Sequence, residues 1–88
     1  FPALKLAHEA ARIGGTMPAV MNAADEVAVQ LFLDRKISFL EIARLVERVM
    51  EMHNPISHPS LDEILSADGW AREQTSALTG GIGIGSNL

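Results

Sequence analysis

The sequence has 88 residues, with 7 Lys and Arg against 11 Asp and Glu, so its formal net charge is −4 at pH 7. Nucleic-acid-binding proteins hold phosphates with clustered basic side chains, whereas the basic residues here are scattered from Lys5 to Arg72 among acidic ones. This distribution argues against a nucleic-acid partner. The absence of Cys excludes disulfides, thiolate nucleophiles and cysteine-ligated metal sites. No apolar run reaches the ~20 residues that span a bilayer, which argues against a membrane partner.

The composition, with 48% hydrophobic and 20% charged residues, is typical of a folded domain rather than of a disordered segment. At this length one domain is the upper limit. The chain begins with Phe1 rather than with Met, which predicts that it is part of a longer polypeptide.

Two helices are predicted in the first half of the chain. The first covers residues 2–13 and ends at Gly14-Gly15, because glycine adopts the backbone conformation that closes a helix. The second covers residues 16–33, with Pro18 in its first turn, where the missing N–H of proline has no helical partner to lose. The predicted buried stripe of the first helix consists of Leu4, Ala7, His8 and Ala11.

Two capping boxes predict the remaining helices. Ser38 and Glu41 have the S-x-x-E spacing and begin a helix that ends near His53. Its apolar residues recur with helical spacing at Ile42, Leu45, Val46, Val49 and Met50.

Ser60 and Glu63 repeat the capping-box spacing at the start of the last helical region. Asp68 is a good N-cap residue directly before Gly69, so we expect this region to be kinked or split near Gly69. The two parts would run from about residue 60 to 66 and from about 68 to 78. Trp70 is expected to anchor the last part in the core.

The predicted fold class is therefore all-α, a small antiparallel bundle of four main helices over residues 1–78. Residues 79–88 are predicted to be a flexible glycine-rich tail. Their G-x-G-x-G pattern follows a helix, whereas a dinucleotide-binding loop is G-x-G-x-x-G between a strand and a helix.

The second predicted helix is apolar on two sides. Val29 and Leu33 lie opposite the side that carries Val20, and a helix of this kind is usually covered by the bundle on one side and by another domain or subunit on the other. The alternative is that both are isolated exposed apolar residues, which are common on protein surfaces. The predicted contact face consists of Asn22, Asp25, Glu26, Val29 and Leu33.

The sequence offers no convincing catalytic or metal site. The three histidines lack the spacing of a zinc site, so we expect His53 to cap the end of its helix and His8 to fill an edge of the core. Asn22 and Glu26 lie one helical turn apart, but no nucleophile is near them, which favours a hydrogen-bond network. We therefore assign no catalytic, cofactor-binding or metal-binding residue to this chain.

Three segments carry a family resemblance: FPALKLAHEA, GGTMPAVMNAADEVAVQLFLDRKISFLEIARLVE and PSLDEILSADGWARE. From Phe1 to Glu73 the chain resembles the C-terminal helical domain of 1-deoxy-D-xylulose 5-phosphate reductoisomerase. The most specific motif begins at Asn22 and reads N-A-A-D-E, where Asp25 replaces the second Asn of the family's N-A-A-N-E.

The resemblance implies a non-catalytic support domain of a larger enzyme. That family converts 1-deoxy-D-xylulose 5-phosphate to 2-C-methyl-D-erythritol 4-phosphate for isoprenoid synthesis, by a rearrangement and a reduction with NADPH that a Mg or Mn ion assists. An N-terminal domain binds the nucleotide, and a central catalytic domain binds metal and substrate. This chain alone would bind neither cofactor and would be inactive.

The implied partners are the nucleotide-binding and catalytic domains of the same polypeptide. The parent enzyme would be a homodimer in the bacterial cytoplasm or in a plastid. The alternative function is a free-standing helical interaction or dimerisation module.

Overall fold

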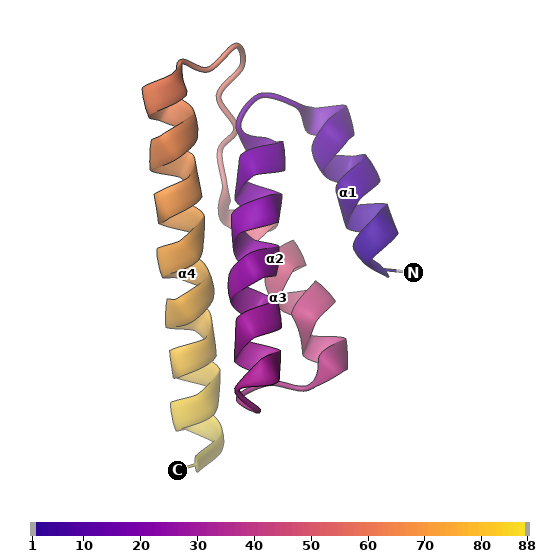
Figure 1. Cartoon of the computed structure of the whole chain (residues 1–88), viewed down its shortest axis with the longest axis vertical. Coiled ribbons are helices and arrows are strands. Elements are labelled where there is room, and N and C mark those ends of the chain that lie inside the picture. The colour runs from indigo at the N-terminus through magenta and orange to yellow at the C-terminus, as the bar shows by residue number, and fades with distance from the viewer. Residues whose placement is uncertain (1, 88) are drawn as a thin grey trace.

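The computed structural model describes the backbone of residues 2–87 and the side chains of residues 2–78. Within residues 2–87 it contains helices and no strand, which confirms the predicted all-α fold (Figure 1). In this part of the chain, no helix combines the length and the apolar character that a membrane span requires. The helices are α1 (Pro2–Ile13), α2 (Met17–Leu33), α3 (Phe39–Met52) and α4 (Leu61–Asn87).

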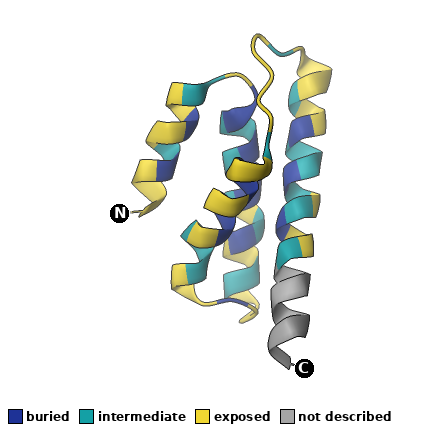
Figure 2. Ribbon diagram, turned by 180° about the vertical axis from the view of Figure 1, so that it is seen from behind, coloured by how far each residue is buried: buried dark blue, intermediate teal, exposed yellow. Residues whose placement is uncertain are grey.

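Helix α2 is the centre of the bundle. It packs against all three other helices, with α1 and α4 on either side of it and α3 behind it in Figure 1. Figure 2, which shows the opposite side, has α3 in front. Consecutive helices are antiparallel, and the long loop before α4 returns the chain to the end where α2 begins, so α2 and α4 run in the same direction. The result is a layer of three helices, α1, α2 and α4, that α3 covers on one side only.

Both predicted capping boxes are present. Ser38 Oγ accepts the Glu41 N–H at 3.3 Å, and the Glu41 carboxylate accepts the Ser38 N–H at 2.7 Å. Ser60 Oγ likewise accepts the Glu63 N–H at 3.1 Å, and the Glu63 carboxylate accepts the Ser60 N–H at 2.8 Å. Each box satisfies two N–H groups that a helix start leaves without a partner, and thereby fixes where α3 and α4 begin. The hydrogen bond from the Ser38 backbone also lowers the pKa of Glu41 below its usual value.

The core consists of small residues on α2 and larger ones around them. Ala23, Ala24 and Ala28 are fully buried, and their small side chains let the neighbouring helices approach α2 closely. The predicted stripe of α3 belongs to the same core: four of its members are buried, and Ile42 is half-buried against them. The other buried apolar residues are Leu6, Ala10, Met17, Val20, Ile37, Leu45, Val46, Val49, Met50, Ala67 and Ala71.

The predicted buried stripe of α1 is wrong. Leu6 and Ala10 are the buried residues of this helix, whereas Leu4, His8 and Ala11 are exposed and Ala7 is half-buried. Helix α1 has apolar residues on two adjacent sides, so periodicity alone does not reveal which side packs against this chain's own bundle. His8 consequently does not fill an edge of the core.

The predicted split near Gly69 is also wrong, because α4 runs through Gly69 as one helix. Asp68 does not cap a new helix: its Oδ1 accepts a hydrogen bond from Arg72 Nε at 2.7 Å, one turn further along. Ala67 and Ala71 are buried on either side, and their packing offsets the roughly 1 kcal/mol that glycine costs inside a helix. The predicted flexible tail, residues 79–88, lies outside the residues whose side chains are described, and it stays a prediction.

Candidate functional site

The predicted contact residues of α2 form one exposed stripe. Asn22, Glu26, Val29 and Leu33 are all exposed, and their spacing of four, three and four residues places them on a single line along the helix. Asp25, beside this line, is half-buried. Leu33 keeps 64% of its surface exposed, which is unusual for a large apolar residue on a helix that packs against three others.

Helix α4 presents a second stripe with the same spacing, formed by Leu61, Leu65, Asp68 and Arg72. Arg72 Nη2 lies 3.4 Å from Glu26 Oε1, so this stripe lies beside the stripe of α2. The hydrogen bonds from Arg72 to Asp68 and Glu26 raise the pKa of its guanidinium above the usual value. Leu61 and Leu65 are 70% and 60% exposed, which adds apolar surface to the α2 stripe.

Helix α1 borders the α2 stripe on the other side. Its residues Lys5 and Glu9 line a groove with Glu47 of α3, so that flank of α1 faces α3. By helical spacing, Leu4, Ala7 and Ala11 occupy the opposite flank of α1. This is the apolar stripe that the sequence analysis had expected to be buried.

We call the combined surface the three-helix face. It is the side of the α1–α2–α4 layer that α3 does not cover. The sequence analysis found its α2 part and missed the α1 and α4 parts. Its members are Leu4, Ala7 and Ala11 on α1, Asn22, Glu26, Val29 and Leu33 on α2, and Leu61, Leu65, Asp68 and Arg72 on α4.

The outer side of α3 has the opposite character. Arg44, Glu47, Arg48 and Glu51 are all exposed there, with oppositely charged residues one turn apart. A surface of this composition is typical of a helix side in contact with water. The bundle therefore has a charged side on α3 and a mostly apolar side on the three-helix face.

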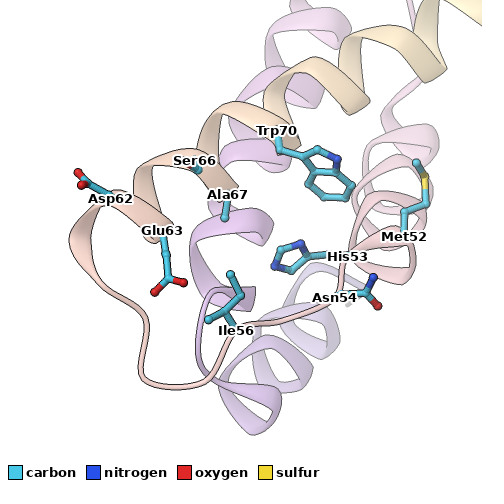
Figure 3. Close-up of a pocket in the computed structure, with 9 residues that line it drawn as sticks. All are labelled: Met52, His53, Asn54, Ile56, Asp62, Glu63, Ser66, Ala67 and Trp70. Carbon is cyan, nitrogen blue, oxygen red and sulfur yellow. The ribbon is translucent and has the colours of Figure 1, made fainter.

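A shallow pocket of about 430 Å³ lies between the end of α3 and the first turns of α4 (Figure 3). The rings of His53 and Trp70 form its floor, with their centroids 5.1 Å apart. Asp62 and Glu63 lie at its rim, and Glu63 is already engaged in its capping box. Trp70 is half-buried against the core and the His53 ring, so it fixes α4 against the end of α3.

His53 does not cap α3 with its side chain, contrary to prediction. Its backbone N–H donates to Met50 O, while its Nε2 lies 2.7 Å from the hydroxyl oxygen of Thr16. Partial burial lowers the pKa of His53. The sequence analysis missed this pairing because 37 residues separate the two side chains.

Thr16 joins the turn between α1 and α2 to the loop between α3 and α4. It is fully buried, its Oγ1 accepts the Ile56 N–H at 2.9 Å, and its backbone N–H donates to Ile56 O at 3.1 Å. The adjacent Gly15 has φ +57°, and a Cβ at this position would lie 2.1 Å from Ile56 O. Position 15 therefore has to be glycine, because the turn needs a positive φ there and the loop backbone at Ile56 leaves no room for a Cβ.

No group of three or more potential metal ligands lies together among the described residues. Among the described side chains, Glu26 accepts a hydrogen bond from Arg72, and no nucleophile is hydrogen-bonded to the carboxylate of Asp25 or Glu26. The residues of the three-helix face suit contact with another protein surface. They do not converge on a pocket as the polar groups of a catalytic site do.

Comparisons with known proteins agree with the sequence resemblance. Residues 1–74 match the family described as the DXP reductoisomerase C-terminal domain. The chain is 56% identical over 78 residues to the 1-deoxy-D-xylulose 5-phosphate reductoisomerase of Synechococcus sp. (strain JA-2-3B'a(2-13)), a match that covers 89% of this chain and 20% of that protein. It is 52% identical over 80 residues to the enzyme of the same name from Halothermothrix orenii, covering 91% of this chain and 21% of that protein.

A solved structure, 1-deoxy-D-xylulose 5-phosphate reductoisomerase from Zymomonas mobilis in complex with NADPH, has the same fold. The TM-score is 0.84 at 49% sequence identity, over 90% of this chain and 21% of that chain. The chain thus spans about a fifth of the length of these relatives. With a family match over most of its residues, the chain belongs to the DXP reductoisomerase C-terminal domain family.

Proposed function

We propose that this chain is the C-terminal support domain of an NADPH-dependent 1-deoxy-D-xylulose 5-phosphate reductoisomerase. The family match and relatives with this name at 50% identity or more support the proposal. The chain corresponds to about a fifth of each relative, so most of the enzyme lies in other domains of the same polypeptide. In this proposal those domains bind nucleotide, metal and substrate, and the chain contributes no catalytic residue.

The three-helix face is the surface that would pack on those domains. The single observation that carries this assignment is the contrast between the two sides of the bundle. Exposed Leu4, Leu33, Leu61 and Leu65 lie on one side. On α3, exposed charged residues cover the outer side over residues 44–51, and the exposed apolar Phe39 and Leu40 are confined to its first turn. Exposed apolar side chains that gather on one side of a small domain are typical of a surface that a partner covers.

A rigid bundle on the catalytic domain would act at a distance from the chemistry. Catalytic side chains must be held within about 0.5 Å of their productive positions, and the packing of the elements that carry them provides this support. Asn22, Asp25 and Glu26 would supply the polar contacts of the interface, with Val29 and Leu33 as its apolar part. Because Asp25 replaces the amide of the family's usual Asn, it accepts hydrogen bonds there but donates none.

The cofactors and assembly of the parent enzyme follow from its relatives. The Zymomonas mobilis structure is described as a complex with NADPH, which supports NADPH as the reductant. The Mg or Mn ion, the homodimer and the location in a bacterial cytoplasm or a plastid rest on the family resemblance stated above.

The test is a substitution on the three-helix face of the full-length enzyme. Glu26→Ala should lower the melting temperature or the turnover modestly, and Leu33→Asp should lower them more, because it places a charge in an apolar contact. Arg48→Gln, on the outer side of α3, is the control and should leave both almost unchanged, because the Arg48–Glu51 ion pair lies in water. Unchanged melting and kinetics for Leu33→Asp would contradict the proposed interface, and self-association of the chain through this face would favour a free-standing module.

A further inference from the structure

A chain of hydrogen bonds holds the loop between α3 and α4 against the turn that precedes α2. The Ile56 N–H donates to Thr16 Oγ1 at 2.9 Å, and Thr16 Oγ1 lies 2.7 Å from His53 Nε2. Within the described part of the chain the Thr16 side chain makes no further hydrogen bond, and Thr16 is fully buried. Figure 3 shows the His53 ring between Ile56 and Trp70, at the floor of the pocket.

The direction of these hydrogen bonds depends on the charge of His53. A hydroxyl has one hydrogen to donate, and Thr16 Oγ1 already accepts the Ile56 N–H. The hydroxyl oxygen has a second lone pair, but its hydrogen finds no acceptor other than Nε2 among the described residues. We therefore infer that it is directed to Nε2, which accepts it only when the imidazole is neutral and carries its own hydrogen on Nδ1. The donor groups then follow one another in the order Ile56, Thr16, His53, and each bond polarises the next.

Protonation of His53 reverses the last bond. Nε2 then carries a hydrogen, so the Thr16 hydroxyl hydrogen must turn away from it inside a buried site. A buried donor without an acceptor costs on the order of 1–3 kcal/mol, so the closed arrangement disfavours the imidazolium. Partial burial, which lowers the pKa of His53, acts in the same direction.

The charged groups around His53 oppose this effect only weakly. On α4, Asp62 and Glu63 line the same pocket and would attract an imidazolium. Both are exposed to water, and Glu63 Oε1 already accepts the Ser60 N–H. On α3, Glu51 lines the groove toward α1 instead. From the turn before α2, the described hydrogen-bond partner of the ring is Thr16, which carries no charge.

We propose that Ile56, Thr16 and His53 form a pH-sensitive latch, closed when His53 is neutral and opened when it is protonated. The loop of residues 53–60 is the moving part. Apart from the latch, the backbone hydrogen bond from the Thr16 N–H to Ile56 O connects it to that turn. His53 binds a proton less tightly in the folded chain than in the unfolded chain, so protonation of His53 lowers the stability of the fold. Above the unfolded value of 6.5 the latch stabilises the fold in full, and its contribution is lost as the pH falls below that value.

The sequence contains a reporter for this latch, since Trp70 is its only tryptophan and contacts the His53 ring. We expect Trp70 fluorescence of the 88-residue chain to titrate with His53, on the acid side of the ordinary histidine pKa. Over the same range the exchange protection of the Ile56 amide should fall several-fold, beyond the intrinsic change of the exchange rate. Helical circular dichroism, recorded in parallel, separates opening of the loop from unfolding of the helices.

Three variants make the test specific. His53→Gln should remove both pH-dependent changes. Thr16→Val, which keeps the shape and removes the hydroxyl, should lower protection of the Ile56 amide at every pH and remove its pH dependence. His8→Gln, at an exposed position of α1, is the matched control and should titrate like the original chain. Constant Ile56 protection across the range, or the same titration in His53→Gln, would overturn the latch.

Discussion

Arg72 Nη2 of α4 lies 3.4 Å from Glu26 Oε1 of α2, and this ion pair joins two stripes of the three-helix face. In the chain by itself both side chains are in contact with water, where solvent screens the attraction between them. In the full-length enzyme, the proposed interface would exclude part of that water and strengthen the pair.

A double-mutant cycle distinguishes these environments. We expect Glu26→Gln and Arg72→Gln to have additive effects on the free energy of unfolding of the chain alone, within the error of the measurement. In the full-length enzyme the same two substitutions should be non-additive. Additive effects in both proteins would mean that the pair stays in water and lies outside the interface.

The two glycines before α2 give a second prediction. Both have positive φ, +72° at Gly14 and +57° at Gly15, but only Gly15 has a neighbour where a Cβ would be placed. Gly14→Ala should lower the free energy of unfolding by about 1 kcal/mol, because it introduces only the backbone strain of a positive φ. Gly15→Ala should cost about 3 kcal/mol or more, since Ile56 O must move. Chemical denaturation of both variants measures the difference, and equal costs would contradict the close contact between turn and loop.

The end of α2 gives a third prediction. Arg35 has φ 61°, its N–H donates to Phe32 O, and the Lys36 N–H donates to Leu31 O, which together form a Schellman motif with Arg where glycine is usual. Arg35→Gly should therefore stabilise the chain by about 1 kcal/mol. Lys36→Gly is the control and should not stabilise it, because Lys36 is not among the described residues with positive φ. A loss of stability in Arg35→Gly would show that the Arg35 side chain matters more than its backbone.

The continuity of α4 gives a fourth prediction. A Cβ at Gly69 would have no atom within 4 Å of it, and Gly69 lies inside the helix. Gly69→Ala should stabilise the chain by about 0.5–1 kcal/mol, which is the usual difference between these residues in a helix. Thermal melting measures it: 1 kcal/mol corresponds to a rise of roughly 4–8 °C for a domain of this size. A lower melting temperature would indicate that the chain needs a break at this position.

The sequence was sufficient to predict where the helices begin and where most of them end. Ser38, Ser60 and the Gly14-Gly15 pair act through local backbone hydrogen bonds, so their effect can be inferred without knowing the tertiary packing. At Gly69 the same reasoning failed, because burial of Ala67 and Ala71 outweighed the local preference for a break.

The functional surface could be predicted only in part. The α2 stripe is visible in the sequence because Val29 and Leu33 are apolar opposite Val20. On α1, periodicity could not distinguish the side that faces this bundle from the side that faces outward, so Leu4 was placed inside. The contact between Thr16 and His53 depends on the path of the chain over 37 residues, which no local pattern encodes.

The most direct test of the three-helix face measures its accessibility in the two contexts. The chain contains no Cys, so a single cysteine can be introduced by Leu33→Cys on this face or by Arg48→Cys on the outer side of α3. A thiol reagent should label both cysteines rapidly in the 88-residue chain, where both positions are exposed. In a full-length reductoisomerase whose other cysteines have been replaced, we predict labelling of Leu33→Cys to slow strongly and that of Arg48→Cys to remain fast. Equal labelling of Leu33→Cys in both proteins would contradict the account, because it would leave the three-helix face uncovered in the enzyme.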